Sequence, residues 1–552
     1  MSALNEVSKQ VMWNRLLSVV EEQAKTLVRA AFSTSVREAG DLSAGIFDRH
    51  GRMLGQAVTG TPGHVNAMAE AVGHFIREIG TEDIFPGDVY ITNDPWKGTG
   101  HLHDITMVTP SFHKEKLVAF FAATAHVVDI GGRGFGPDAN EVYEEGLRIP
   151  IMKFADRGEL NDSLISIIRN NVRMQDQVLG DMFSLVACNQ AAHARLLDTL
   201  QEFAVDDLEE IAEFILSTSR RITLERIAAL PKGTYRSEMT VDGYDAPVKM
   251  QATITIDGNG IKVDFAGTSG TSRFGINVPM IYTRAYTCYA LKCAVAPDVP
   301  NNTASLEPFE VTAPEGSILN AVHPAPVSTR HVIGHLVPDV VLGALSQCLP
   351  DRIPAEGASA LWNIHISARP VDGVSSARPA VEVLMFNSGG TGARPGFDGL
   401  SATAFPSGVH CMSVEATEHV GPIVVWRKEL RPGSGGAGRL RGGLGQIIEI
   451  GSIDGYAFHF NAMFDRVAHP ARGRSGGHAG GAGIVRLADN TPLRGKGRQF
   501  VAPDQRLVLE LPGGGGFGEP KERDRTAVRC DLAAGFISAK EAEELYGLDG
   551  AC

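Results

Sequence analysis

The spacing of apolar and polar residues changes along the chain from a helical period to a strand period. Residues 6–30 place apolar side chains on one helical face with charges between them, which predicts a long amphipathic helix. Residues 45–55 predict two short strands around a glycine turn, and residues 64–79 return to the helical period. The amino-terminal part is therefore expected to combine helices with a sheet.

Strand patterns dominate the next part of the chain. Residues 88–92 predict a strand that ends at Asn93-Asp94-Pro95, because proline lacks the amide hydrogen that a strand ladder needs. Ile105–Phe112 and Leu117–Ala125 then predict a β-hairpin, joined by a polar turn over residues 113–116.

The pattern changes from helix to strand after residue 228. Residues 160–228 are mostly helical by pattern, and short alternating strands follow from about residue 233. Glycine-rich stretches, which we expect to be turns, recur at Asn387–Gly392, Gly433–Gly445, Gly473–Gly483 and Gly513–Gly518. The pattern predicts a mixed, multi-domain α+β protein: an α/β amino-terminal region (1–230), a β-rich, glycine-punctuated region (231–520) and a helical segment (521–552).

Composition narrows the class of protein. The 552 residues are 43% hydrophobic, which excludes a mainly disordered chain, and 62 of them are glycine. A net charge of −13, without a block of Lys and Arg, argues against nucleic acid or an anionic membrane as a partner. No apolar run is long enough to span a bilayer, and the first residues do not resemble a secretory signal. The seven cysteines form no Cys-x-x-Cys pair, which is typical of reduced cysteines in a cytoplasmic protein.

Two His-x-x-Asp units flank the predicted hairpin: His101-Leu102-His103-Asp104 precedes it, and His126-Val127-Val128-Asp129 follows it. Facing residues of an antiparallel pair have Cβ atoms ~4.5–5.5 Å apart. A turn centred on Lys114 and Glu115 places Phe112 opposite Leu117, His103 opposite His126, and Asp104 opposite Ala125. A bulge would shift this register by one residue without separating the two units.

Imidazoles and carboxylates without a thiolate suit a divalent ion such as Mn²⁺, Zn²⁺ or Fe²⁺. Such an ion lowers the pKa of water toward ~7, which would supply a nucleophile without an activated serine or cysteine. The hairpin would then be metal-bearing. The alternative is that these are polar strand-end residues that are merely hydrogen-bonded. Further candidates, each more often a turn or cap residue, are Asp41, His64, Asn93 and Asp94.

The glycine-rich stretches do not form a nucleotide-binding motif. None matches Gly-x-x-x-x-Gly-Lys-Ser/Thr, so the chain has no P-loop. Residues 435–445 include two arginines among backbone N–H groups that could hold an anion, although glycine-rich turns are the simpler interpretation.

A series of short segments runs through nearly the whole chain. In the first part these are Phe32-Ser33, Arg37–Ser43, Asn93-Asp94-Pro95, His101–Thr106, His126–Gly132, Glu145–Pro150, Asn171–Arg173 and Gly180-Asp181. The later ones are Asp264–Ser269, Gly392–Gly399, Glu429–Gly438, Pro512–Gly518 and Glu522–Asp524. In this order they resemble the hydantoinase B/oxoprolinase family.

The resemblance implies the B-type, metal-bearing component of a two-component enzyme. In relatives, a separate hydantoinase A-type ATPase subunit phosphorylates the amide or ketone oxygen of the substrate. The implied assembly is a hetero-oligomer that opens a small cyclic amide: a hydantoin, oxoproline or another lactam. The same resemblance assigns the metal ligands, and with them the catalytic residues, to Asp41, His101, Asp104, His126 and Asp129.

Two other functions stay open. Acetone and acetophenone carboxylases use a similar subunit, and a non-catalytic scaffold could carry a purely structural metal. The chain also departs from the family pattern Thr-His-Leu-Pro-Asp, because it reads Gly100-His101-Leu102-His103-Asp104. His103 is therefore either an additional ligand or a residue that faces the other side of the strand. Two further polar loops, Ser328–His331 and Asp465–Pro470, also differ from those of relatives.

Overall fold

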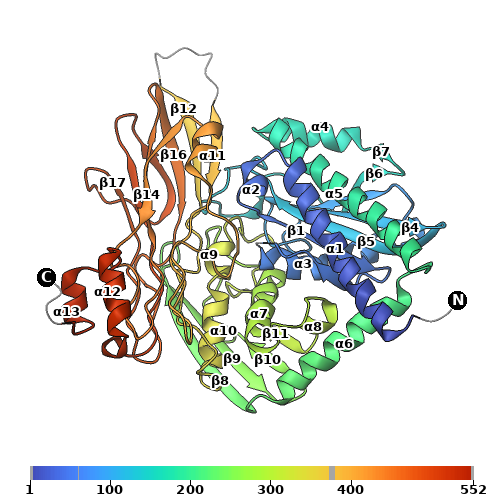
Figure 1. Ribbon diagram of the computed structural model, residues 1–552. Coiled ribbons are helices and arrows are strands. Elements are labelled where there is room, and N and C mark those ends of the chain that lie inside the picture. The colour runs from blue at the N-terminus through green and yellow to red at the C-terminus, as the bar shows by residue number, and fades with distance from the viewer. Residues whose placement is uncertain (1–3, 60, 372–379, 549–552) are drawn as a thin grey trace.

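The computed structural model describes residues 4–59, 61–371 and 380–548. Helices and sheets are mixed in several layered units, which confirms the expected fold class (Figure 1). The amino-terminal layers lie on one side of the molecule, and the β-rich half lies on the other. A smaller sheet with its helices lies between them along one edge.

The first unit is a seven-stranded sheet with the order β2-β1-β5-β4-β3-β6-β7. Its strands are β1 (Leu42–Asp48), β2 (Met53–Gln56), β3 (Val89–Thr92), β4 (Asp104–His113), β5 (Lys116–His126), β6 (Met152–Asp156) and β7 (Glu159–Leu160). Helices α1 (Glu6–Ala30) and α5 (Gln175–Glu202) cover one face. Helix α3 (Pro62–Ile79) covers the other. Nearly every residue of β4 and β5 is buried. Because successive side chains of a strand point to opposite faces, both faces of these two strands must be covered.

The hairpin register differs by one residue from the sequence expectation over most of its length. Phe112 faces Leu117 as predicted, but a bulge at Val118 places Ser111 opposite Ala119. As a result Asp104 faces His126, so the predicted pairs His103–His126 and Asp104–Ala125 are wrong. The turn itself lies at Lys114 and Glu115, whose φ angles of 48° and 65° match the twist of a two-residue hairpin turn.

The second unit is a four-stranded sheet with the order β11-β10-β9-β8. Its strands are β8 (Gly233–Val241), β9 (Val248–Ile256), β10 (Ile261–Asp264) and β11 (Phe309–Thr312). Helix α10 (Val337–Leu345) packs on this sheet, and α7 (Met280–Val295) lies between α10 and α3. One hydrophobic core runs from α1 to α10, so it is continuous across residue 230.

The third unit is a β-sandwich. Its sheets have the orders β13-β12-β16-β18 and β14-β15-β19-β17, and one hydrophobic core draws side chains from both. The strands are β12 (Ile364–Pro370), β13 (Val381–Met385), β14 (Ile423–Leu430), β15 (Gln446–Ser452), β16 (Tyr456–Met463), β17 (Ile484–Leu487), β18 (Lys496–Val501) and β19 (Leu507–Glu510).

The remaining helices connect or cap these units. They are α2 (Thr34–Arg37), α4 (Asp162–Asn171), α6 (Glu209–Ala228), α8 (Thr303–Leu306), α9 (His331–Gly334), α11 (Val414–Val420), α12 (Arg525–Ala533) and α13 (Ala539–Glu544). Short 3₁₀ turns occupy Thr81–Asp83, Val142–Glu144 and Pro520–Glu522. Helices α12 and α13 bear out the helical pattern expected at the carboxy end, and they share a small core of their own.

The glycine-rich stretches are not mainly turns. Segments 389–392, 435–443, 473–481 and 513–516, here called the glycine bundle, lie side by side and exchange backbone hydrogen bonds outside the sheets. Examples are Gly436 N to Gly514 O and Gly514 N to Gly443 O. A Cβ on Gly390 would lie 1.9 Å from Gly443 O, so the backbones approach more closely than any side chain allows.

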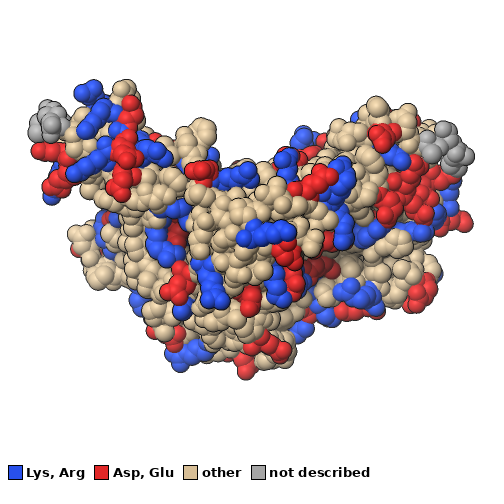
Figure 2. Space-filling view, turned by 90° about the horizontal axis from the view of Figure 1, so that it is seen from below, with Lys and Arg blue, Asp and Glu red and all other residues tan. Residues whose placement is uncertain are grey.

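The surface mixes both signs of charge. In Figure 2, Lys and Arg are interspersed with Asp and Glu over the visible face. Within the described ranges, no helix is long and apolar enough to cross a membrane. The described cysteines are all free thiols.

Candidate metal centre

The two His-x-x-Asp units meet at the open end of the hairpin. His101, Asp104 and His126 are buried, and each offers a ligand atom within 4.8 Å of those of the other two. Asp104 begins β4 and His126 ends β5, directly opposite each other in the ladder. The pairing of the two strands therefore sets the distance between the carboxylate and the imidazole.

The two oxygens of Asp104 face different groups. Oδ1 lies 2.7 Å from His101 Nε2 and 3.1 Å from His126 Nδ1. Oδ2 instead accepts hydrogen bonds from Thr99 Oγ1 at 2.7 Å and from Arg330 Nη2 at 2.5 Å, and it lies 2.8 Å from His64 Nε2. Burial alone would raise the pKa of the Asp104 carboxyl, but His101, His64 and Arg330 hold it well below its usual range.

The tautomer of His101 follows from its partners. Its Nδ1 lies 2.8 Å from the carbonyl oxygen of Ser328, which can only accept, so Nδ1 carries the proton. Burial, reinforced by Arg330, lowers the pKa of His101 to about 3, so the ring is neutral and Nε2 presents a lone pair. That lone pair and Asp104 Oδ1, both acceptors, lie 2.7 Å apart. Two acceptors at this distance repel each other unless they share a cation, so these residues fit a metal ion.

Asp41 and His64 lie beside this group. Asp41 precedes β1, and its Oδ1 accepts a hydrogen bond from Thr61 Oγ1 at 2.9 Å. Its Oδ2 is 3.9 Å from His126 Nδ1. Both residues are buried, and both line the small cavity that contains His101 and His126.

His103 lies beside His101, His126 and Phe135 in one group of buried rings. It is fully buried, and neither ring nitrogen has a hydrogen-bond partner among the described residues. Its ring stacks on that of His126, with centroids 5.5 Å apart and an interplanar angle of 12°. This placement brings His103 next to a candidate ligand, while its own role as a ligand stays a prediction.

Asp129, the fifth predicted ligand, is held by other groups. Its Oδ1 accepts from Gly131 N at 3.0 Å and from Arg173 Nη1 at 2.8 Å, and its Oδ2 accepts from the backbone N–H of Arg173. It is not one of the three residues whose ligand atoms cluster.

Asn93 and Asp94 brace loops. Asn93 Nδ2 donates to the carbonyl oxygens of Leu102 and Leu147, and Asp94 pairs with Arg148. These contacts match the ordinary turn role that the sequence allowed for both residues.

Arg330 is one of the residues at the site that the sequence did not reveal. It is buried, its Nε donates to Thr99 O at 2.8 Å, and its guanidinium lies 4.0 Å from the ring centroid of Tyr282. With its bond to Asp104 Oδ2, these contacts fix the carboxylate so that only Oδ1 faces His101 and His126. The signal in the sequence was the unusual loop Ser328–His331, which carries no motif that names a role.

Glu145 holds the same loop from the other side. Its Oε1 accepts from the backbone N–H groups of Val327 and Ser328 at 2.6 and 2.7 Å, which fixes the carbonyl that binds His101. Burial raises the pKa of Glu145 to about 8, although the two backbone donors oppose the shift. Glu145 therefore positions His101 through Ser328.

A second group of aromatic and imidazole rings covers the site. Phe135 lies 4.9 Å from His126 and 5.5 Å from His331, measured between ring centroids. His331 and His335 are buried, and burial lowers the pKa of each well below its usual value. His331 Nε2 and His335 Nδ1 have no hydrogen-bond partner among the described residues.

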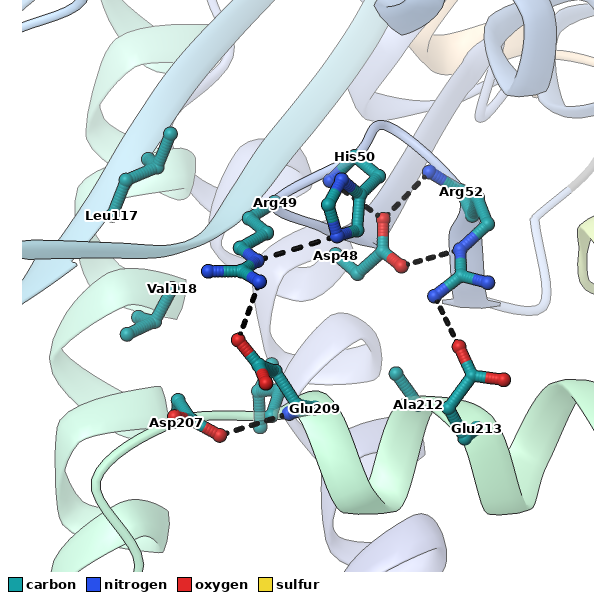
Figure 3. Close-up of a pocket in the computed structure, with 11 residues that line it drawn as sticks. Asp48, Arg49, His50, Arg52, Leu117, Val118, Asp207, Glu209, Ala212 and Glu213 are labelled. Carbon is teal, nitrogen blue, oxygen red and sulfur yellow. Dashed lines mark hydrogen bonds and ion pairs between the residues drawn. The ribbon is translucent and has the colours of Figure 1, made fainter. Parts of the chain in front are cut away.

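A separate cavity of about 140 Å³ is lined largely by charged side chains that form ion pairs with one another. Figure 3 shows its side chains turned toward one another between the β1–β2 turn and α6. Arg49 pairs with Glu209 at 2.7 Å, and Arg52 pairs with Asp48 at 2.6 Å and with Glu213 at 2.7 Å. These ion pairs fasten the turn to the helix.

Comparison with known proteins places the chain in a family. The family model described as Hydantoinase B/oxoprolinase matches residues 5–520. The chain therefore belongs to the hydantoinase B/oxoprolinase family, as its motifs predicted.

Individual relatives match over nearly their whole length. A protein of Pseudomonas sp. (strain NS671), provisionally named as the B component of a D-/L-hydantoinase, is 28% identical over 99% of this chain and 95% of its own. The beta component of the caprolactamase of Pseudomonas jessenii is 27% identical over 99% of this chain and 97% of its own.

Two solved structures share the fold. The ATP-dependent caprolactamase from Pseudomonas jessenii matches with a TM-score of 0.90 and 24% identity, over 100% of this chain and 98% of its own. A nucleotide-free acetone carboxylase matches with a TM-score of 0.86 and 19% identity, over 98% of this chain and 79% of its own.

Proposed function

We propose that this chain is the metal-bearing B-type subunit of an ATP-dependent hydrolase that opens a cyclic amide, such as a hydantoin, oxoproline or another lactam. A partner of the hydantoinase A type binds ATP and phosphorylates the substrate. The observation that carries the proposal is the pair of buried acceptors, His101 Nε2 and Asp104 Oδ1, which lie 2.7 Å apart. Family membership and relatives named as components of a hydantoinase and a caprolactamase support it.

The chemistry follows from the weakness of the substrate. The carbonyl carbon of an unstrained cyclic amide is a poor electrophile, and O-phosphorylation turns its oxygen into a leaving group. A divalent ion at this site supplies Lewis-acid chemistry, which polarises a bound oxygen and makes water a better nucleophile at neutral pH. We assign its ligands to His101, Asp104, His126 and Asp41, with Mn²⁺, Zn²⁺ and Fe²⁺ as the candidate metals.

The chain's own residues prepare this reaction. Arg330 and Thr99 hold Asp104, and Glu145 holds the Ser328 carbonyl that sets the tautomer of His101. Phe135 packs against the histidines and excludes bulk water from them. Asp129, the fifth predicted ligand, is left out of this assignment because Arg173 and Gly131 already bond its oxygens.

The test is co-expression with the A-type ATPase subunit, followed by metal analysis and ATP-coupled turnover of hydantoins, lactams and ketones. We expect about one divalent ion per chain and ATP-dependent ring opening. Double replacement of His101 and His126 by alanine with retained metal and retained hydrolysis would place the chemistry elsewhere.

Two outcomes of the same screen would favour the alternatives. Stimulation by bicarbonate, with labelled carbon incorporated into a ketone, would identify a carboxylase, the activity named for the acetone carboxylase of the same fold. Ring opening that survives removal of the metal, with the complex still assembled, would leave the chain a scaffold.

A further inference from the structure

The space beside the assigned ligands is too small for the ring of a substrate. The cavity that Asp41, His101 and His126 line has a volume of about 20 Å³, which is room for about one water molecule. By comparison, an engineered cavity of roughly 150 Å³ binds benzene. Two larger cavities, each of about 440 Å³, have none of these ligands in their lining. A cyclic amide therefore reaches the ligands only if a side chain makes room for its ring.

Phe135 is a side chain that occupies such a place. Its ring is buried and lines the small cavity. Its centroid lies 4.9 Å from those of His103 and His126 and 5.8 Å from that of His101. The ring of His331 stacks on it, with centroids 5.5 Å apart and an interplanar angle of 25°. A phenyl ring thus lies among four imidazoles, two of which belong to assigned ligands.

This apolar ring leaves a polar neighbour without a partner. His103 is fully buried, and neither of its ring nitrogens has a hydrogen-bond partner among the described residues. Buried polar side chains are nearly always hydrogen-bonded in native proteins. An imidazole nitrogen can donate to a carbonyl or accept from an N–H, and a phenyl ring offers neither. A ring that carries an amide would supply both groups in the same place.

Phe135 is held by its backbone and by packing. Its carbonyl oxygen accepts a hydrogen bond from Asn461 Nδ2 at 2.8 Å, which ties the loop to β16 of the β-sandwich. The glycine that follows permits this close approach, because a Cβ on Gly136 would lie 2.8 Å from Asn461 Cγ. The phenyl ring itself makes no hydrogen bond. Its displacement therefore costs packing contacts and leaves the bond to Asn461 in place.

We propose that the ring of the cyclic amide binds where the Phe135 ring lies, stacked on His331 and hydrogen-bonded to His103, and that Phe135 is the gate that it displaces. The inference deepens the proposed function and rests on it. In this place the substrate ring lies beside His101 and His126, two of the assigned ligands. When no substrate is bound, Phe135 fills the space and keeps bulk water from the ligands.

Replacement of Phe135 tests the proposal on the full chain, without ATP or a partner. Phe135→Ala empties the place of the ring, so we expect hydantoin and 2-pyrrolidone to bind at least about tenfold more tightly than to the wild type, which must first displace its own side chain. Phe135→Leu keeps more of the packing and should show a smaller gain. Isothermal titration calorimetry measures the affinities, and circular dichroism confirms that each variant is folded.

The matched controls are Phe154→Ala and Phe154→Leu. Phe154 is fully buried on β6 of the same sheet, so its replacement empties a similar volume away from the assigned ligands. We expect no gain in affinity from these variants. An equal gain would mean that any emptied ring site accepts the probes, and it would overturn the proposal. Unchanged affinity, or no detectable binding, in both Phe135 variants would overturn it as well.

The contact with His103 is tested in the Phe135→Ala background. Addition of His103→Phe keeps a flat ring at this position but removes its hydrogen bonds. We expect affinity for hydantoin to fall several-fold while the metal content stays the same. Unchanged affinity would overturn the contact, and a loss of metal would make His103 a ligand instead.

The proposed function fails by a different result. Absence of ATP-coupled hydrolysis of any amide by the assembled complex would refute it, even if Phe135→Ala still binds both rings more tightly than the wild type.

Discussion

The candidate metal centre and the glycine bundle are both buried and polar, yet they are built in opposite ways. At the metal centre, paired strands hold the backbone while side chains such as His101 and Asp104 point at one another. In the bundle, backbone meets backbone, and a Cβ on most of its glycines would overlap a carbonyl oxygen. Substitution at the first should therefore remove chemistry and spare the fold, whereas substitution at the second should remove the fold.

The largest effect is expected in the bundle. A Cβ on Gly514 would lie 1.9 Å from Thr391 O, a backbone atom that cannot move aside cheaply. We expect Gly514→Ala to lower the free energy of unfolding by more than about 4 kcal/mol or to prevent folding. The control is Gly270→Ala, whose Cβ would have its nearest neighbour at 3.9 Å. Urea unfolding followed by circular dichroism measures both, and equal stability of the two variants would contradict this view of the bundle.

Next in size is the loss of a ligand. Asp104→Ala and His126→Ala should each weaken metal binding by more than about a hundredfold, because each removes one of the few side chains that can ligate the ion. Metal content by mass spectrometry and competition with a chelator measure this effect. The matched control is His193→Ala, which removes a histidine that bonds Ser111 on the same sheet. A control variant that loses as much metal would show that the effect is not local.

A smaller effect is expected at Arg330, which touches Asp104 rather than the proposed ion. Its replacement by methionine should lower metal affinity by about 10–100-fold, the usual range for a residue that orients a ligand. Arg330→Lys keeps the charge but loses the second bond to Thr99 O, so its affinity should fall between those of the wild type and Arg330→Met. Unchanged metal affinity in Arg330→Met would mean that Asp104 keeps its orientation unaided.

Taken per pH unit, the smallest effect is expected from a change of pH. Because the pKa of Glu145 is raised to about 8, the folded chain keeps between pH 4.5 and 8 a proton that the unfolded chain releases. The free energy of unfolding should therefore fall as pH rises through this window, by at most about 1.4 kcal/mol per pH unit. Glu145→Gln cannot ionise and should flatten that slope, whereas Glu159→Gln, on the surface, should not. Equal slopes in the wild type and Glu145→Gln would refute the assignment.

Much of the fold could be predicted locally, since period and turn residues act within a few positions. Helix α1, strands β1 and β2 and the hairpin β4–β5 lie where the pattern placed them. The hairpin register could not be predicted, because the bulge at Val118 depends on how β5 fits between β1 and β4. The glycine stretches could not be predicted correctly either, because composition does not distinguish a turn from segments that pack against one another.

The residues of the candidate site, too, could be predicted from the sequence only in part. The two His-x-x-Asp units identified His101, Asp104 and His126, because a hairpin brings the residues at its open end together. Arg330 and Glu145 could not be assigned a role, since they reach the site from loops that are distant in sequence and marked by no periodicity.

By itself, the sequence determined the main helices and strands of the amino-terminal part, the family and the meeting of His101, Asp104 and His126, because these depend on local period and motif spacing. Tertiary structure alone decided which oxygen of Asp104 faces His101 and His126 and which tautomer His101 adopts. Those properties arise from contacts between segments hundreds of residues apart, such as Arg330 with Asp104. No local pattern records them, since burial and packing create them only once the whole chain has folded.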